Sequence, residues 1–345
     1  NFAWNNTSIE EIHFGTGLQE IREAAFNAEH FTSIYIKNLE NWSSVQFYEP
    51  LSCDKFYLND VELTSIDTTQ SGPSKFSEYC FANCSSLSEL KVTGERSIMS
   101  HAFSNCKNLS TLYVGPDVTV GASAFIGCPV EYVSIPSRYH FYIDKGHIEV
   151  LTLFGNVSED SFKNQKSLKE VTLDDSTKII GKRAFEGCSN IESVLIEPNS
   201  QLSYIGESAF SGCNHIIYHS NNLLCLKNTS GVLSYMIGSS SDIVDCVVPN
   251  GIKVISEDAL RDRANLKTLT ISASVVNINT GFHKNTPNLE SIQISGVENK
   301  FKVSNNCLID VTTNTLIAGC KTSNLTNDIA HIGAYSFSGQ GIVQV

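Results

Sequence analysis

The sequence predicts a solenoid, a fold in which short repeats stack along one axis, and three observations lead to this prediction. A phenylalanine-headed pattern recurs: Phe103 is followed by cysteine at the third residue and by apolar residues at the sixth, ninth and eleventh. Phe81 and Phe185 are followed by the same residue types at the same steps. Only 22 residues separate Phe81 from Phe103 and Phe103 from Phe125. A repeat this short cannot enclose a core, so neighbouring copies must cover its apolar side chains.

Each repeat has two apolar parts. In the later part apolar and polar residues alternate, as Leu112 and Val114 do around Tyr113, which is typical of a half-buried strand. The earlier part is a short apolar segment that includes the fifth residue before the phenylalanine, such as Ile98 before Phe103. A helix of average length, roughly 11 residues, does not fit beside a strand and two turns. We therefore expect repeats built from short strands and turns.

The array begins close to the N-terminus, because Ile9, Ile12 and Phe14 match the last three apolar steps of a repeat. Further repeats are headed by Phe26, Phe81, Phe103, Phe125, Phe162, Phe185, Phe210, Leu260 and Phe282. Residues 137–146 depart from the pattern, and we interpret them as part of a degenerate repeat whose strand spans residues 148–153. We expect a single solenoid domain over residues 1–345.

Three wider gaps between repeats each contain a predicted hairpin insert, near residues 51–70, 221–250 and 300–330. In each insert, two apolar arms flank a short polar segment. The predicted turns are Asn59-Asp60, Thr229-Ser230-Gly231 and Thr312-Thr313-Asn314. Glycine and asparagine are favourable in such turns because they tolerate the positive φ angles that hairpin loops need.

Cysteine usage does not indicate a framework of disulfides. Of the eleven cysteines, five occupy the third step after the head residue, namely Cys84, Cys106, Cys128, Cys188 and Cys213. Gln165 and Arg263 fill the same step in other repeats, so we expect buried free thiols there rather than obligate pairs. Cys307 and Cys320 lie on opposite arms of a predicted hairpin, where a local disulfide is an alternative to two free thiols.

Charge and hydropathy exclude some classes of partner. The chain has 24 Lys and Arg against 36 Asp and Glu, a net charge of −12, without a block of like charge. This balance argues against nucleic acid and anionic membrane surfaces as partners. The sequence contains no apolar run of about 18 residues, so we expect no membrane insertion within this chain.

Catalytic and cofactor motifs are absent from the sequence. It contains no G-x-S-x-G, H-E-x-x-H or phosphate-binding glycine loop. His215 and His219 have the spacing of a helical metal pair, but they fall where other repeats form a strand. On a strand, residues four apart lie about 13 Å from each other. We therefore predict no metal, no cofactor and no enzymatic activity.

The outward side chains of the strands are the best candidates for ligand binding. Tyrosine is concentrated on these positions in the N-terminal half and Ser or Thr in the C-terminal half. Tyrosine is enriched in interfaces because it offers contact area and a hydroxyl group. The predicted ligand-binding residues are Tyr35, Lys91, Tyr113 and Tyr132. Tyrosine and threonine also favour exposed strand positions in general, and this alternative stays open.

The motif A-F-x-x-C-x-x-L-x-x-L-x-V, preceded by I-G-x-x-A-F at Ile180–Phe185 and Ile205–Phe210, resembles the BspA-type leucine-rich repeat. The resemblance covers nearly the whole chain. It implies a leucine-rich repeat solenoid with a parallel β-sheet on the concave side. Short strands, turns and 3-10 segments are expected on the other side, with β-hairpin inserts. Proteins of this family are mostly at the cell surface or secreted, and they adhere to host proteins or other cells.

Two functional hypotheses follow. The first is a non-enzymatic extracellular or cell-surface adhesion module that binds a protein or glycoprotein through the strand side of the solenoid. The alternative is a structural spacer of a larger surface protein, with no ligand of its own. The sequence leaves the ligand and the oligomeric state open.

Overall fold

A computed structural model describes residues 9–26, 30–297 and 300–340 of the chain. The chain divides into two compact units: the first comprises Asn1–Phe154 and Gln165–Val171, and the second Gly155–Asn164 and Thr172–Val345. Each unit is built from stacked parallel strands and turns, which confirms the predicted solenoid class. One continuous solenoid over residues 1–345 stays a prediction, and residues 1–8 and 341–345 of that range lie outside the described residues.

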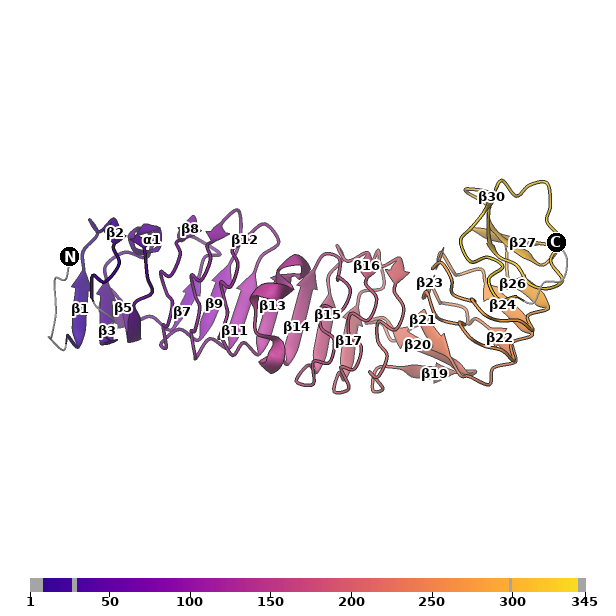
Figure 1. Cartoon of the computed structure of the whole chain (residues 1–345), viewed down its shortest axis with the longest axis horizontal. Coiled ribbons are helices and arrows are strands. Elements are labelled where there is room, and N and C mark those ends of the chain that lie inside the picture. The colour runs from indigo at the N-terminus through magenta and orange to yellow at the C-terminus, as the bar shows by residue number, and fades with distance from the viewer. Residues whose placement is uncertain (1–8, 27–29, 298–299, 341–345) are drawn as a thin grey trace. The chain divides into compact units, whose positions relative to one another are not determined.

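Parallel strands form one side of the first unit, as Figure 1 shows. β1 (Glu11–Phe14), β3 (His30–Ile36) and β5 (Ser52–Leu58) pair in that order. A second run pairs in the order β7 (Ser65–Asp67), β9 (Glu89–Val92), β11 (Thr111–Val114), β13 (Tyr132–Pro136) and β14 (Val150–Phe154). Equivalent residues are in register, for example Leu90, Leu112 and Val133. The strand that we expected at residues 148–153 begins at Val150 instead.

Short strands and turns form the opposite side of the first unit (Figure 1). β8 (Lys75–Phe76), β10 (Ser97–Ile98) and β12 (Thr119–Val120) make a second parallel ladder, and β2 (Glu20–Ile21) pairs with β4 (Gln46–Phe47). The short helix α1 (Leu39–Ser44) is capped by the Asn38 side chain, which accepts a hydrogen bond from the Asn41 N–H. Two 3-10 helices, Ser137–Tyr142 and Lys145–His147, occupy the segment that departs from the repeat pattern.

The second unit contains parallel strands and two antiparallel inserts. β15 (Glu170–Leu173) contains residues of both units, and it is followed by β16 (Ile179–Ile180), β17 (Ser193–Ile196) and β18 (Tyr204–Ile205). One sheet has the order β19 (Tyr218–Ser220), β20 (Leu223–Lys227), β21 (Leu233–Ser239), β23 (Val254–Ile255) and β25 (Asn277–Ile278). Another has the order β22 (Asp245–Val247), β24 (Thr268–Ser272) and β26 (Ser291–Ser295). A last sheet has the order β27 (Phe301–Ser304), β28 (Cys307–Asp310), β29 (Thr315–Ala318) and β30 (His331–Ile332).

Antiparallel hairpins interrupt the parallel strands, as the predicted fold class requires. β5 turns into β6 (Val61–Glu62) through Asn59 and Asp60, whose φ angles are 52° and 65°. β19 and β20 are joined through Asn221 and Asn222, with φ of 49° and 65°. The β27–β28 turn contains a further asparagine pair with positive φ at both residues. Two successive positive φ angles define the turn type whose twist matches the twist of the flanking strands.

Columns of phenylalanine rings form the core. In the first unit, Phe103 stacks between Phe81 and Phe125 with ring centroids 5.6 and 5.9 Å apart. In the second unit, Phe185 stacks between Phe162 and Phe210 at 5.7 and 5.4 Å. These side chains are at most 2% exposed. Burial of one such ring contributes about 1.5–3 kcal/mol, and only the neighbouring repeats provide that burial.

Candidate binding face

The first unit presents a surface, here the strand face, formed by the outward side chains of β1, β3, β5, β7, β9, β11, β13 and β14. Every second residue of a strand points to this face. Strand register arranges the residues in rows that cross the strands. One row of the longer run contains Asp67, Lys91, Tyr113, Ser134 and Thr152, and the other contains Ser65, Glu89, Thr111, Tyr132 and Val150.

The structure brings three of the four predicted ligand-binding residues close together. Lys91 and Tyr113 are paired neighbours in one row. Tyr132 lies in the other row, on the strand next to that of Tyr113, and pairs with Thr111. Tyr35 lies on β3, which belongs to a different run of strands. The predicted residues therefore form two separate groups on the strand face.

Lys91 is held between an aromatic ring and a carboxylate. Its Nζ lies 5.8 Å from the centroid of the Tyr113 ring and 3.7 Å from Asp67 Oδ2. The Asp67 carboxylate also accepts hydrogen bonds from the hydroxyl and backbone N–H of Thr69. These bonds, together with the charge of Lys91, lower the pKa of Asp67. The ammonium group is thus positioned by a carboxylate that stays ionised.

Tyr113 and Tyr132 differ in how they are exposed. The Tyr113 ring meets Phe154 edge to face, with centroids 5.9 Å apart, and is half-buried in its row. Tyr132 is 48% exposed. A fixed ring beside an exposed ring gives a partner both a rigid contact surface and an accessible hydroxyl.

A stack of three aromatic rings forms the second group. The Tyr35 ring lies parallel to His13, with centroids 4.1 Å apart, and to Tyr57 at 4.6 Å. His13, Tyr35 and Tyr57 are directly paired in the strand register. Tyr57 was not among the predicted residues. The signal was available, because Phe47 precedes Phe56 and Leu58 by nine and eleven residues, the usual steps of a repeat. The cysteine step holds Pro50, and we interpreted this stretch as part of an insert.

Strands β24 and β26 of the second unit carry hydroxyl and amide groups at the equivalent positions. In β24 and β26, Thr268 pairs with Ser291 and Thr270 pairs with Gln293. Thr268 Oγ1 donates to Asp245 Oδ1 at 2.6 Å. This part of the chain therefore offers polar groups rather than aromatic surface.

The cysteine thiols are structural. All eleven are free and buried, so Cys307 and Cys320 form no disulfide in this structure. Burial raises the pKa of Cys225 and of Cys246 to about 12. The thiolate is the nucleophilic form, and it is scarcely populated at such a pKa near neutral pH.

The buried histidines are part of the core. His283 Nε2 lies 3.1 Å from the Ser336 carbonyl oxygen, and burial lowers the pKa of His283 to about 4. Burial also lowers the pKa of His140, whose Nδ1 lies 2.8 Å from the Ser137 carbonyl oxygen. Across residues 9–26, 30–297 and 300–340, no three His, Cys, Asp or Glu side chains converge as a metal site would require. Nor does any helix of the described chain have the length and hydropathy of a membrane-spanning segment.

Solved structures with a similar chain path include several bacterial leucine-rich repeat proteins. One from Bacteroides ovatus is 17% identical, with a TM-score of 0.31, and the match covers 100% of this chain and 79% of that one. A leucine-rich cell surface protein from Faecalibacterium prausnitzii is 20% identical, with a TM-score of 0.29 and coverage of 97% and 81%. The pneumococcal vaccine antigen PcpA is 14% identical, with a TM-score of 0.24 and coverage of 96% and 82%. No curated protein sequence matches the chain.

The family comparison is decisive for classification. The profile of the BspA type leucine rich repeat region matches in six copies, over residues 58–146, 147–222, 200–312 and 234–345. These ranges include the phenylalanine-headed repeats from Phe81 onwards and the inserts of the second unit. The protein therefore belongs to the BspA-type leucine-rich repeat family.

Proposed function

We propose that the protein is a non-enzymatic extracellular adhesion module that binds a protein or glycoprotein through the strand face of its first unit. The main support for this proposal is that Lys91, Tyr113 and Tyr132 lie close together. These side chains lie on adjacent strands, and the first two are fixed by contacts with their neighbours.

The physical properties of the strand face support protein binding. Tyrosine contributes a large contact area with few rotatable bonds, so ordering it at an interface loses little entropy. The rows also contain both acidic and basic groups, such as Glu89 and Lys91 on the same strand. Such a mixed surface suits complementary charges on a folded partner better than the uniformly negative backbone of a nucleic acid.

The burial of the cysteine thiols is compatible with an extracellular location. An oxidising environment pairs or modifies cysteines that are exposed and ionised. Every cysteine of this chain is buried, so its thiol is shielded from oxidants and from other thiols. Membership of a family whose proteins are mostly displayed at the cell surface or secreted adds to this support.

Binding measurements with tyrosine variants test the proposal. We would immobilise the full chain and screen it against purified matrix proteins and cell-surface glycoproteins. For a partner found in this way, Tyr113→Ala and Tyr132→Ala should each weaken binding by about tenfold or more, the effect of removing an interface residue worth about 1.4 kcal/mol. Tyr48→Ala is the matched control, because Tyr48 is 46% exposed in the same unit but lies outside the strand face.

Equal affinities for the unmodified chain and both strand-face variants would remove the proposed site. Failure of the whole panel to bind would favour the alternative, a structural spacer without a ligand of its own. Thermal unfolding of each variant must match that of the unmodified chain, so that a loss of binding is not a loss of folding.

A further inference from the structure

Hydrogen bonds between successive turns, here the turn ladder, link the regular repeats of the second unit. The backbone N–H at the phenylalanine step donates to the carbonyl oxygen just before the next phenylalanine, as from Phe185 to Ala209 at 2.9 Å. A second bond begins two residues later, from the Gly187 N–H to the Ser211 carbonyl oxygen at 2.7 Å. Each repeat thus presents a row of donors that the following repeat satisfies.

The turn ladder is interrupted after Phe210, where the β20–β21 hairpin separates this repeat from the next. The carbonyl oxygen of Ala259, which by analogy would accept from Phe210, instead accepts from Ser239 Oγ at 3.0 Å. The carbonyl oxygen of Arg261, the counterpart two residues later, accepts from Arg263 Nη1 at 2.7 Å. One side chain of the insert, Ser239, and one of the second repeat, Arg263, therefore occupy the acceptors of the missing bonds.

On the N-terminal side of this break, two backbone N–H groups have no hydrogen-bond partner in the described part of the chain. In the part of the chain that the structure describes, the N–H groups of Phe210 and Gly212 have no hydrogen-bond acceptor. Phe210 is only 2% exposed, so its N–H is largely withdrawn from water. An unpaired backbone donor in such a place is unfavourable, and a ligand that supplies a carbonyl oxygen would relieve it.

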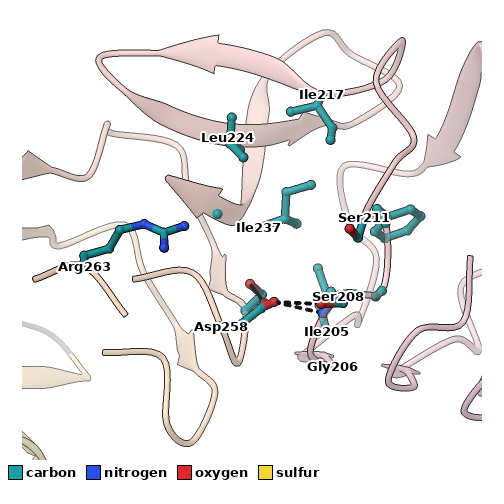
Figure 2. A pocket seen from close by; sticks show the side chains of 13 residues that line it. Ile205, Gly206, Ser208, Ser211, Ile217, Leu224, Ile237, Asp258 and Arg263 are labelled. Carbon is teal, nitrogen blue, oxygen red and sulfur yellow. Dashed lines mark hydrogen bonds between the residues drawn. The ribbon is translucent and has the colours of Figure 1, made fainter. Parts of the chain in front are cut away.

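A carboxylate bridges the edge of the break. The Ser208 N–H donates to Asp258 Oδ2 at 2.9 Å, in place of the backbone carbonyl that the regular turn ladder would supply (Figure 2). Ser256 Oγ donates to the other carboxylate oxygen at 3.3 Å. Burial raises the pKa of Asp258. A side chain thus takes the place of a backbone carbonyl at this edge of the break.

The space opened by the break is a pocket of about 210 Å³. Figure 2 shows Ile217, Leu224 and Ile237 on one side of it, opposite Ser208 and Asp258. Arg263 flanks the pocket, and its guanidinium group is held by Ser239 through Nε at 2.9 Å and Nη2 at 2.8 Å. The pocket therefore combines an apolar wall with the unpaired backbone N–H of Phe210 at its border.

We propose that this pocket binds an extended peptide segment of a partner protein that carries one bulky apolar side chain. The regular repeats show what fills the equivalent space: an Ala-Phe segment that supplies carbonyl oxygens to the turn ladder and a ring to the core. The volume is below the roughly 300–1,000 Å³ of sites for drug-sized ligands and suits one side chain with its adjoining backbone. Backbone pairing then supplies affinity and the apolar wall supplies selectivity, as in other cases where a peptide extends a hydrogen-bonded edge.

A peptide copied from the chain's own repeat is the direct probe. Acetylated and amidated Arg-Ala-Phe-Glu-Gly, the sequence of residues 183–187, would be titrated into the full chain. We expect saturable binding in which the amide resonances of Phe210 and Gly212 shift. The peptide with alanine in place of phenylalanine should bind at least tenfold more weakly.

Two variants fill the pocket. Leu224→Trp places a large ring inside it, and Ser211→Trp covers it from an exposed position at its border, so a folding defect in the first does not remove the test. Each should weaken binding of the peptide at least tenfold. Val232→Trp, on a residue that is 48% exposed and does not line the pocket, should leave binding unchanged.

Three results would overturn the proposal: no binding of the peptide at millimolar concentration, equal binding by the variants that fill the pocket, or binding of phenylalaninamide as tight as that of the peptide. The last result would identify a small-molecule pocket instead. Tyr113→Ala should not alter peptide binding, because the pocket and the strand-face residues belong to different compact units. This site and the proposed adhesion site can therefore fail independently.

Discussion

At the scale of single residues, the cysteines of four repeats each link their repeat to the one before it. Cys106 Sγ donates to the Phe81 carbonyl oxygen at 3.2 Å, and Cys128 Sγ donates to that of Phe103 at 3.0 Å. The second unit repeats the contact from Cys188 at 2.9 Å and from Cys213 at 3.1 Å. A small apolar side chain with a weak donor fits this step because the site is buried and a carbonyl oxygen faces it.

The buried thiols predict a specific loss of stability at high pH. Cys225 and Cys246 have a pKa of about 12 in the folded chain, against an ordinary value of 9.0. Between these values the unfolded chain has released the thiol protons and the folded chain has not, so the free energy of unfolding falls as pH rises. Each thiol contributes about 1.4 kcal/mol per pH unit in this window, and nothing below it.

Urea unfolding at several pH values between 7 and 11 measures this loss. The double variant Cys225→Ala, Cys246→Ala is less stable at neutral pH but should lose stability less steeply above pH 9. Lysine and tyrosine titration affects both chains alike. An identical pH dependence of the two chains would show that these thiols do not keep their protons on folding.

The turns around the repeat phenylalanines also have an unusual backbone conformation. The residues two before and two after the repeat phenylalanine have positive φ, as at His101 with 56° and Asn105 with 58°. The later position is held by Asn, Asp or Gly, which tolerate this conformation, whereas the earlier one includes Tyr79 and Arg183. The preference for Asn, Asp or Gly at the later position is visible in the sequence. The positive φ at the earlier position is not visible there, because the stacking of the repeats imposes it.

At the scale of elements, close approach between repeats explains the glycine of the I-G-x-x-A-F motif. Gly181 N–H donates to the Val157 carbonyl oxygen at 2.8 Å. A Cβ atom added to Gly181 would lie 2.5 Å from the Glu159 backbone nitrogen and 2.7 Å from the Ser158 carbonyl carbon. These are backbone atoms, so they cannot move aside without displacing a turn.

Gly181→Ala should therefore lower the free energy of unfolding by about 1–3 kcal/mol, the range for overpacking in a tight interior. Gly17→Ala is the matched control, because no atom lies within 4 Å of the added Cβ there. Chemical denaturation of the two variants measures the difference. A Gly181 variant as stable as the Gly17 variant would mean that neighbouring turns are not packed as closely as described.

The hairpin inserts show where sequence reasoning reaches its limit at this scale. Their existence follows from the wide gaps between repeats and from apolar arms around polar turns. The turns at Asn221-Asn222 and Asn305-Asn306 were not predicted, because the asparagine pairs were interpreted as the starts of arms. The pocket beside Asp258 could not be predicted either, since it results from the displacement of one repeat by an insert.

At the scale of the whole molecule, the repeated apolar spacing was enough to predict the solenoid class and the covering of each repeat by its neighbours. The composition of the strand face was harder to predict, because the register between paired strands decides which side chains become neighbours. Lys91 and Tyr113 were predicted from the regular repeats, and their pairing follows from the 22-residue spacing. Tyr57 was missed because its strand was interpreted as part of a hairpin insert, although Phe47 precedes Phe56 and Leu58 at the repeat spacing. The strand register pairs Tyr57 with Tyr35.

Each repeat is stable only because its neighbours cover it. Substitution of Phe103 tests this dependence, since Phe103 is fully buried between Phe81 and Phe125. Phe103→Ala should lower stability by about 3–5 kcal/mol. In an array with nearest-neighbour contacts, this loss of stability first destabilises the adjoining repeats.

Amide hydrogen exchange, followed by mass spectrometry on peptides along the full chain, is the measurement that decides. For Phe103→Ala we expect faster exchange in the repeats headed by Phe81 and Phe125 and unchanged exchange in β24 and β26. Phe141→Ala, at a residue that is 73% exposed, serves as the control and should change neither region. An equal loss of protection in all regions of the Phe103 variant would reveal a single cooperative core and contradict the account.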